Sequence, residues 1–163
     1  GSAVAAPSAP AAPAAEIKLG QAQYAAHGTK CFTVTTVAMQ GDRIISALID
    51  DYQIVNKADF ICVPNSDADF GQGFVDADTK GLASKRQNSD AYSANMAKAG
   101  STVAIADNFK AIEAFVAGKT VAELEASIQD KTPEQVVEAV SGCTLVDTVG
   151  YINSVIAAAQ NAQ

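Results

Sequence analysis

The hydrophobic and polar positions divide the chain into a strand-like first half and a helical second half. β-Branched residues dominate residues 31–39 and 43–50, and Gln40-Gly41-Asp42 between them has the composition of a turn. Two such runs around a short glycine-containing loop predict a β-hairpin. Residues 17–26 alternate loosely and predict another strand, while residues 54–63 are a candidate extension of the sheet.

Capping residues and apolar stripes predict five helices beyond residue 87. The first is expected to begin at Asn88 or Ser89 and to run to Gly100. The second is expected to have Asp107 as its cap and to end at Gly118, because aspartate favours the start of a helix and glycine its end.

Two capping-box patterns mark the starts of the next two helices. Thr120 and Glu123 form the first, and Thr132 and Gln135 form the second, with Pro133 at the first helical position. A threonine followed three residues later by Glu or Gln can satisfy two otherwise free backbone donors, so both are well-defined helix starts.

The last helix is expected to begin at Asp147 or Thr148. Its apolar stripe consists of Tyr151, Ile152, Val155, Ile156 and Ala159. Strands followed by helices predict an α+β fold, with an antiparallel sheet formed mainly by the N-terminal half. Helices from the C-terminal half are expected to pack on one face of this sheet.

Composition predicts one domain and a tether. Of the 163 residues 48% are hydrophobic, which suits a single core over residues 16–163. Residues 1–15 are almost entirely Ala, Pro and Ser and predict an extended tether, as in a secreted protein or lipoprotein whose export signal has been removed. The alternative is an ordinary disordered tail.

The net charge limits the possible partners. A charge of −7 argues against nucleic acid, which needs clustered Lys and Arg, and against adsorption to an anionic membrane. An acidic protein can still bind one phosphate through backbone groups and a hydroxyl.

Few residues have the chemistry for metal binding or catalysis. The single histidine, His27, leaves no Ser-His-Asp or His-rich arrangement and is expected at the surface. Cys31, Cys62 and Cys143 form no CxxC pair, and Cys31 and Cys62 are expected to be small buried apolar residues. A disulfide stays open. We therefore predict no metal site and no catalytic group.

A polar loop at residues 64–73 suggests calcium as a weaker alternative. Asp67 and Asp69 stand at alternate positions, as carboxylates do in a calcium loop. An EF-hand that starts at Asn65 would need glycine at its sixth position, where Phe70 stands. Turns also favour Asn, Asp and Gly without any ion. A calcium-dependent adhesion module is thus a third functional reading.

The tetrad Ser141-Gly142-Cys143-Thr144 interrupts two predicted helices. It places two hydroxyls and a flexible glycine just before a helix N-terminus, where unpaired N–H groups favour phosphate. A plain helix-to-helix turn with a hydroxyl cap explains the same residues. Tyr92 and Met96 are four residues apart on a predicted helix, so they belong either to the core or to an apolar wall beside a cofactor.

The tetrad resembles the Ser-Gly-Ala-Thr motif of the FMN-binding domain family. Residues 20–158 as a whole resemble pheromone-precursor lipoproteins of Gram-positive bacteria within that family. The resemblance also rests on Gly28-Thr29-Lys30-Cys31-Phe32-Thr33-Val34, Val63-Pro64-Asn65-Ser66-Asp67, Leu82-Ala83-Ser84-Lys85, Tyr92-Ser93-Ala94-Asn95-Met96 and Ala99-Gly100-Ser101-Thr102. In this family a threonine carries FMN through a phosphoester, which a flavin transferase forms from FAD outside the cytoplasm.

The resemblance implies a secreted, cell-surface lipoprotein that carries electrons, rather than a stand-alone enzyme. Thr144 would bear covalent FMN, with Ser141, Gly142 and Cys143 beside it and Tyr92 and Met96 along the ring. The implied partners are a flavin transferase and a membrane or extracellular redox protein, with membrane contact only through an N-terminal lipid anchor.

Two positions depart from the family motif. Glu138 stands where aspartate is usual, and Cys143 replaces alanine. They favour the alternative of a flavin-free surface module, for binding or signalling, with the same fold.

Overall fold

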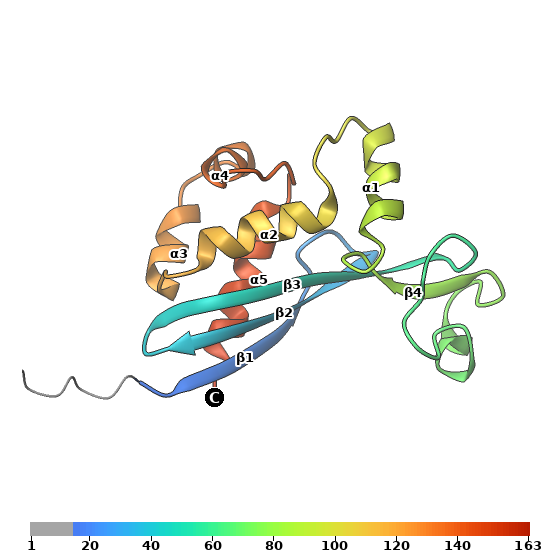
Figure 1. Ribbon diagram of the computed structural model, residues 1–163, viewed down its shortest axis with the longest axis horizontal. Helices are drawn as coiled ribbons and strands as arrows, with labels where there is room; N and C mark the ends of the chain where they lie inside the picture. Colours follow the sequence, from blue (N-terminus) through green and yellow to red (C-terminus); the bar gives the residue numbers. More distant parts are fainter. Residues whose placement is uncertain (1–14) are drawn as a thin grey trace, which may run out of the picture.

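The computed structural model describes residues 15–163, which form a four-stranded antiparallel sheet and five α-helices. The strands are β1 (Ile17–Tyr24), β2 (Cys31–Gln40), β3 (Arg43–Asn56) and β4 (Lys80–Ser84), paired in the order β1-β2-β3-β4. The helices are α1 (Ser89–Lys98), α2 (Ile105–Val116), α3 (Val121–Ile128), α4 (Pro133–Ala139) and α5 (Thr148–Gln160). The predicted α+β class is confirmed (Figure 1). The predicted tether, apart from Ala15, lies outside the described residues.

The predicted hairpin is present as β2 and β3. Its loop has two residues, Gly41 and Asp42, and Gly41 takes a positive φ of 61° that glycine adopts without strain. Along β2 the inward positions Thr33, Thr35 and Val37 are buried, whereas the alternate positions lie on the more exposed outer face.

The sheet departs from the sequence prediction at its far edge. Residues 54–63 do not continue as one strand: β3 ends at Asn56, and β4 pairs with residues 52–56 instead. The intervening residues 57–79 form loops and a short 3-10 helix, Asp69–Gly73. A five-residue strand that contains Gly81 has too little periodicity to be recognised, and pairing with β3 holds it in place.

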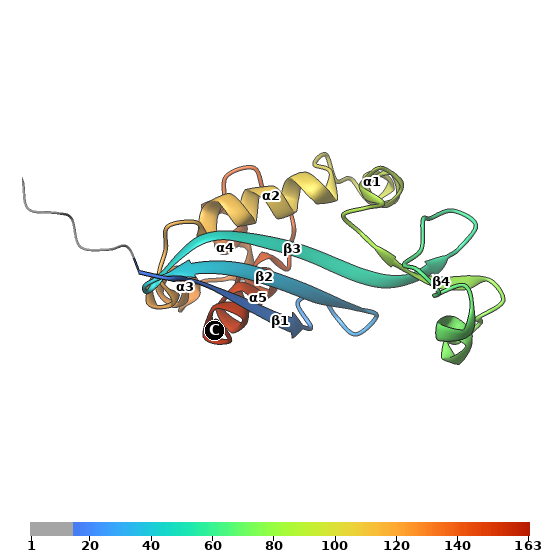
Figure 2. The same cartoon turned by 60° about the horizontal axis from the view of Figure 1, so that its bottom comes forward.

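The helices cover one face of the curled sheet, as predicted. α5 packs on β1 and β2, α2 packs on β3, and α3 and α4 pack against α5 (Figure 2). The core between them is formed by residues that include Val37, Ile49, Phe109, Ile112, Tyr151, Ile152 and Val155. Gly150 allows α5 to approach the backbone of Ala26 so closely that any side chain would collide with its carbonyl.

Helix starts agree with the predictions only in part. Thr132 and Gln135 form the complete capping box at α4, whereas Thr120 caps α3 alone. α2 begins at Ile105 rather than behind Asp107, because Ser93 and Ser89 of α1 accept its first free amides at 3.0 and 3.1 Å. A side chain from another helix thus replaces the local cap.

No helix among residues 15–163 is long and apolar enough to cross a membrane.

Candidate functional site

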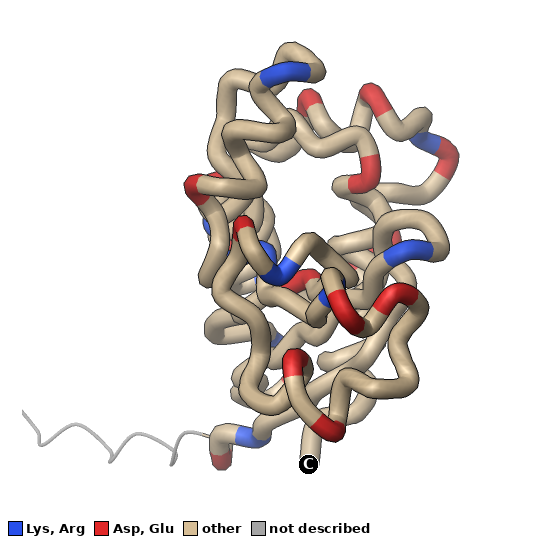
Figure 3. The backbone as a smooth tube through the Cα atoms, turned by 90° about the vertical axis from the view of Figure 1, so that its right-hand side faces the viewer, with Lys and Arg blue, Asp and Glu red and all other residues tan. Residues whose placement is uncertain are grey.

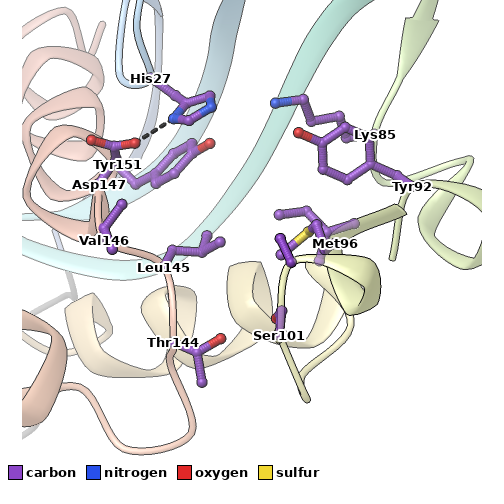
Figure 4. Close-up of a pocket in the computed structure, with 12 residues that line it drawn as sticks. His27, Lys85, Tyr92, Met96, Ser101, Thr144, Leu145, Val146, Asp147 and Tyr151 are labelled. Carbon is purple, nitrogen blue, oxygen red and sulfur yellow. Dashed lines mark hydrogen bonds and ion pairs between the residues drawn. The ribbon is translucent and has the colours of Figure 1, made fainter. Parts of the chain in front are cut away.

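A cavity of about 350 Å³ lies between α1, the start of α2 and the loop that joins α4 to α5 (Figure 4). Its walls are largely apolar, with Tyr92 and Met96 on α1, Ile105 on α2, and Leu145 and Val146 on the loop. Ligand sites typically enclose about 300–1,000 Å³ and combine apolar walls with a few polar groups. The cavity is therefore large enough for a small flat ligand.

Of the predicted site residues, the structure brings Thr144, Tyr92 and Met96 to this cavity. Thr144 lies at one end beside Ser101, and Tyr92 lies toward the other (Figure 4). Tyr92 and Met96 are half-buried and pack against the edge of the core while facing the cavity. They therefore belong to the core and also form an apolar wall of the cavity.

The other three residues of the tetrad do not line the cavity. Gly142 turns the chain with a φ of 85°, which accounts for the glycine after α4. Ser141 is exposed, and Cys143 is buried with its Sγ 3.0 Å from the hydroxyl of Thr148. The Cys143 thiol is thus held by the start of α5.

A buried asparagine holds Thr144 in place. The Asn108 carboxamide oxygen accepts the Thr144 amide at 2.7 Å and its hydroxyl at 3.3 Å. The Asn108 amide donates to the carbonyls of Val103 and Ala104, each at 3.3 Å. Asn108 escaped the sequence analysis, although a polar residue within the apolar stripe of Ile105, Phe109 and Ile112 was a visible signal.

The helix start behind Thr144 offers fewer free amides than predicted. The amides of Thr148 and Gly150 already donate to the carbonyls of Leu145 and Asp147, at 3.1 and 2.9 Å, whereas the Val149 amide has no hydrogen-bond partner among the described residues. Asp147 occupies the N-cap position without a capping hydrogen bond, and its carboxylate pairs with His27.

A buried ionic cluster lies behind the other end of the cavity. The Lys85 ammonium is 2.6 Å from the Asp51 carboxylate, and the two side chains are only 3% and 0% exposed. Asp51 also accepts the hydroxyls of Thr33 at 2.7 Å and Tyr151 at 3.3 Å. Lys85 lies 4.7 Å from the centre of the Tyr92 ring, so its charge is within cation–π range.

Lys85 and Tyr151 of this cluster keep their protons at neutral pH. Burial lowers the pKa of the Lys85 ammonium, but the charge of Asp51 and a hydrogen bond to it outweigh burial and raise the pKa above its ordinary value. Burial, followed by the charge of Asp51, raises the pKa of Tyr151 far above its usual range. Lys85 is consequently a permanent cation and Tyr151 a permanent hydrogen-bond donor.

His27 is exposed, as predicted, and its ring also lines the cavity. Its ring comes from the loop between β1 and β2 and pairs with Asp147 across the rim (Figure 4). Both side chains are more than a third exposed, at 46% and 39%. The pair joins two segments that are 120 residues apart in sequence.

Sequence reasoning missed the whole cluster of Lys85, Asp51 and Tyr151. Tyr151 was visible only as part of an apolar stripe, and Lys85 only as the last residue of the segment Leu82-Ala83-Ser84-Lys85 that supports the family resemblance. The register of the strands brings these residues together. Thr33 lies opposite Asp51 across β2 and β3, and the Lys85 amide donates to the Asp51 carbonyl at 2.8 Å.

The cysteine prediction needs a correction. Cys31 and Cys62 are partly exposed rather than buried, because each stands at the margin of the sheet. All three cysteines are free. The Cys31 thiol donates to the His27 carbonyl at 2.8 Å, and burial together with the charge of Asp51 raises its pKa to about 11.

The calcium reading finds no support in the described part of the chain. Asp67 and Asp69 are exposed, and residues 15–163 contain no group of three or more His, Cys, Asp or Glu side chains placed to hold an ion.

The basic residues do not form a stripe of the kind that nucleic acid needs on the side of the molecule shown in Figure 3. There the Lys and Arg positions are scattered among Asp and Glu.

No model of a protein family, no curated protein and no solved structure matches this chain.

Proposed function

We propose that this protein is an extracytoplasmic electron carrier with FMN joined to Thr144 through a phosphoester. The observation that carries the proposal is the position of Thr144, whose exposed hydroxyl stands at the mouth of an apolar cavity. The resemblance of the tetrad to the flavin-bearing motif adds the chemical identity of the ligand.

The residues of the cavity suit a flavin ring in size and character. Tyr92 and Met96 on one side, and Leu145 on the other, offer aromatic, thioether and aliphatic surfaces to a flat heterocycle. Thr144 is an exposed residue at one end of this apolar space, so a phosphate on it would be near water while the ring is covered.

Each residue would have a limited role. Bound flavin supplies electron transfer in one- or two-electron steps, and this needs no dedicated acid or base from the protein. Thr144 would anchor the cofactor, Asn108 would hold the anchoring loop, and Tyr92 and Met96 would orient the ring and exclude water. A separate redox protein would donate or accept the electrons.

The two departures from the family motif have different weight. Cys143 is buried against Thr148 and does not face the cavity, so its thiol is kept away from a bound ring. Glu138 is exposed on α4, where a transferase could still reach its carboxylate. The longer side chain of Glu138 would therefore affect recognition by the transferase and not the binding of a flavin that is already attached.

Mass spectrometry after co-expression with a flavin transferase tests the proposal. We expect wild-type protein to gain the mass of one FMN less water, Thr144→Ala to gain nothing, and the exposed control Thr102→Ala to behave as wild type. An unmodified wild-type chain, in cells where the transferase modifies its own natural substrate, would refute it.

A flavin-free binding or signalling module is the second candidate. It is favoured by the Thr144 hydroxyl, which already donates to Asn108, and by the amides of Thr148 and Gly150, which already donate to backbone carbonyls. The same experiment separates the two, because this alternative predicts no adduct under any condition.

A further inference from the structure

The Lys85 ammonium is directed at the cavity with donors to spare. It carries three N–H groups, and Asp51 is its only ion-pair partner among residues 15–163. Lys85 lines the cavity, whereas Asp51 lies behind it and does not. The pair therefore forms a dipole with its positive end toward the cavity.

The Asp51 carboxylate is fully engaged inside the protein. Thr33, Tyr151 and Lys85 all donate to it, and no solvent reaches its side chain. A ligand would gain little from Asp51 itself and would meet the ammonium of Lys85 first. Burial makes this important, because a charged hydrogen bond is stronger where water is excluded.

Asp147 is the other acidic or basic side chain besides Lys85 that lines the cavity among the described residues, apart from the His27 ring. Its carboxylate is engaged by His27 at the exposed rim, away from Lys85. The remaining lining near Lys85 is aromatic or aliphatic, with Tyr92, Met96 and Leu145 around it. The cavity thus combines apolar walls with a cation at one end.

We propose that the cavity selects flat, mainly apolar molecules that carry one anionic group, and that Lys85 is the residue that determines this specificity. An aromatic carboxylate is the simplest member of the class. Its ring would be covered by the apolar walls, and its carboxylate would receive the unused donors of Lys85. This selectivity concerns the same cavity as the flavin proposal but depends on Lys85 and not on Thr144.

A pair of matched probes tests the proposal on the flavin-free chain of 163 residues. 2-Naphthoate and 2-naphthamide have the same ring and nearly the same shape, but only the first is an anion at pH 7. NMR titration, followed on the methyl group of Met96, reports both affinity and location. We expect naphthoate to bind at least about tenfold more tightly, as a charge-assisted hydrogen bond implies.

Variants assign the preference to Lys85. Lys85→Met alone leaves Asp51 as an unpaired buried charge, so Asp51→Asn/Lys85→Met provides a neutral version that is better able to fold. In the double variant we expect the two probes to bind equally well. Lys98→Met removes an exposed lysine at the end of α1, outside the cavity, and should keep the wild-type preference.

Several outcomes would overturn the proposal. These are equal affinities of the probes for wild type, binding of neither probe, or a preference for naphthoate that survives in the folded double variant. The probe preference is measured on flavin-free protein and depends on Lys85. A missing FMN adduct would therefore refute the flavin carrier and leave this inference standing, whereas equal probe affinities would refute this inference and leave the flavin carrier standing.

Discussion

The two ends of the cavity differ in how the protein holds them. At the Lys85 end, polar groups from β2, β3, α5 and the residue after β4 satisfy one another in the interior. At the Thr144 end, a single exposed loop is held by Asn108. The buried end is coupled to the stability of the fold, whereas the exposed end is free to react. Substitutions should therefore separate stability from attachment chemistry.

The largest effect is expected at the buried end. Lys85→Met should lower the free energy of unfolding by about 3–5 kcal/mol, because the Asp51 carboxylate then stays buried without a counter-charge. Urea denaturation of the variant and wild type measures the loss. Asp51→Asn/Lys85→Met should be more stable than the single variant, and a double variant that is less stable would contradict the argument.

The next effect is expected at the residue that joins the loop to the core. Asn108→Ala should cost about 1–3 kcal/mol, since the Thr144 amide loses its buried acceptor. Thermal or urea unfolding of the variant and of wild type measures this loss in the free energy of unfolding. Faster amide exchange at Thr144, with unchanged exchange in the central strands, should accompany it. A loss spread over the whole sheet would show that Asn108 does not act through this loop.

Alkaline pH should lower the stability of the fold, as Cys31 and then Lys85 and Tyr151 lose their protons in the unfolded chain. The pKa of Cys31 is raised to about 11, so between pH 9 and 11 the unfolded thiol loses its proton while the folded one retains it. Stability therefore falls as pH rises through this window. The pKa values of Lys85 and Tyr151 are also raised by folding. These two groups should therefore lower the stability further as the pH rises above about 10, where both side chains lose their protons in the unfolded chain.

Cys31→Ser isolates the thiol contribution. Its urea midpoint should fall less than that of wild type between pH 9 and 10, where the thiol is the first of the three groups to ionise in the unfolded chain. Parallel curves for the two proteins would mean that the Cys31 pKa is not raised by folding.

The smallest stability effect is expected at Thr144 itself. Thr144→Val keeps the backbone hydrogen bond to Asn108 and removes a hydroxyl whose hydrogen bond to the same Asn108 oxygen is long, at 3.3 Å. The free energy of unfolding should therefore change by no more than about 0.5 kcal/mol. The same substitution should abolish covalent FMN in the co-expression experiment. A large loss of stability would mean that the hydroxyl has a structural role, as in the flavin-free alternative.

Local sequence signals predicted the structure correctly in places where the stabilising contacts join residues close together in the chain. The hairpin follows from alternation around Gly41-Asp42, and the start of α4 from the capping box of Thr132 and Gln135. The break after α4 follows from Gly142, which takes the left-handed conformation that glycine favours. These features depend on backbone preferences within a few residues.

The sequence by itself thus determined the α+β class, most element boundaries and the loop that presents Thr144. Only the tertiary structure decided that β4 pairs with β3, that serines of α1 cap α2, and that Lys85, Asp51 and Tyr151 meet. These contacts join residues 12 to 100 positions apart, and their energy comes from burial and pairing rather than from local conformation. A lone charge or an aromatic residue in an apolar stripe acquires its role only when the fold selects its neighbour.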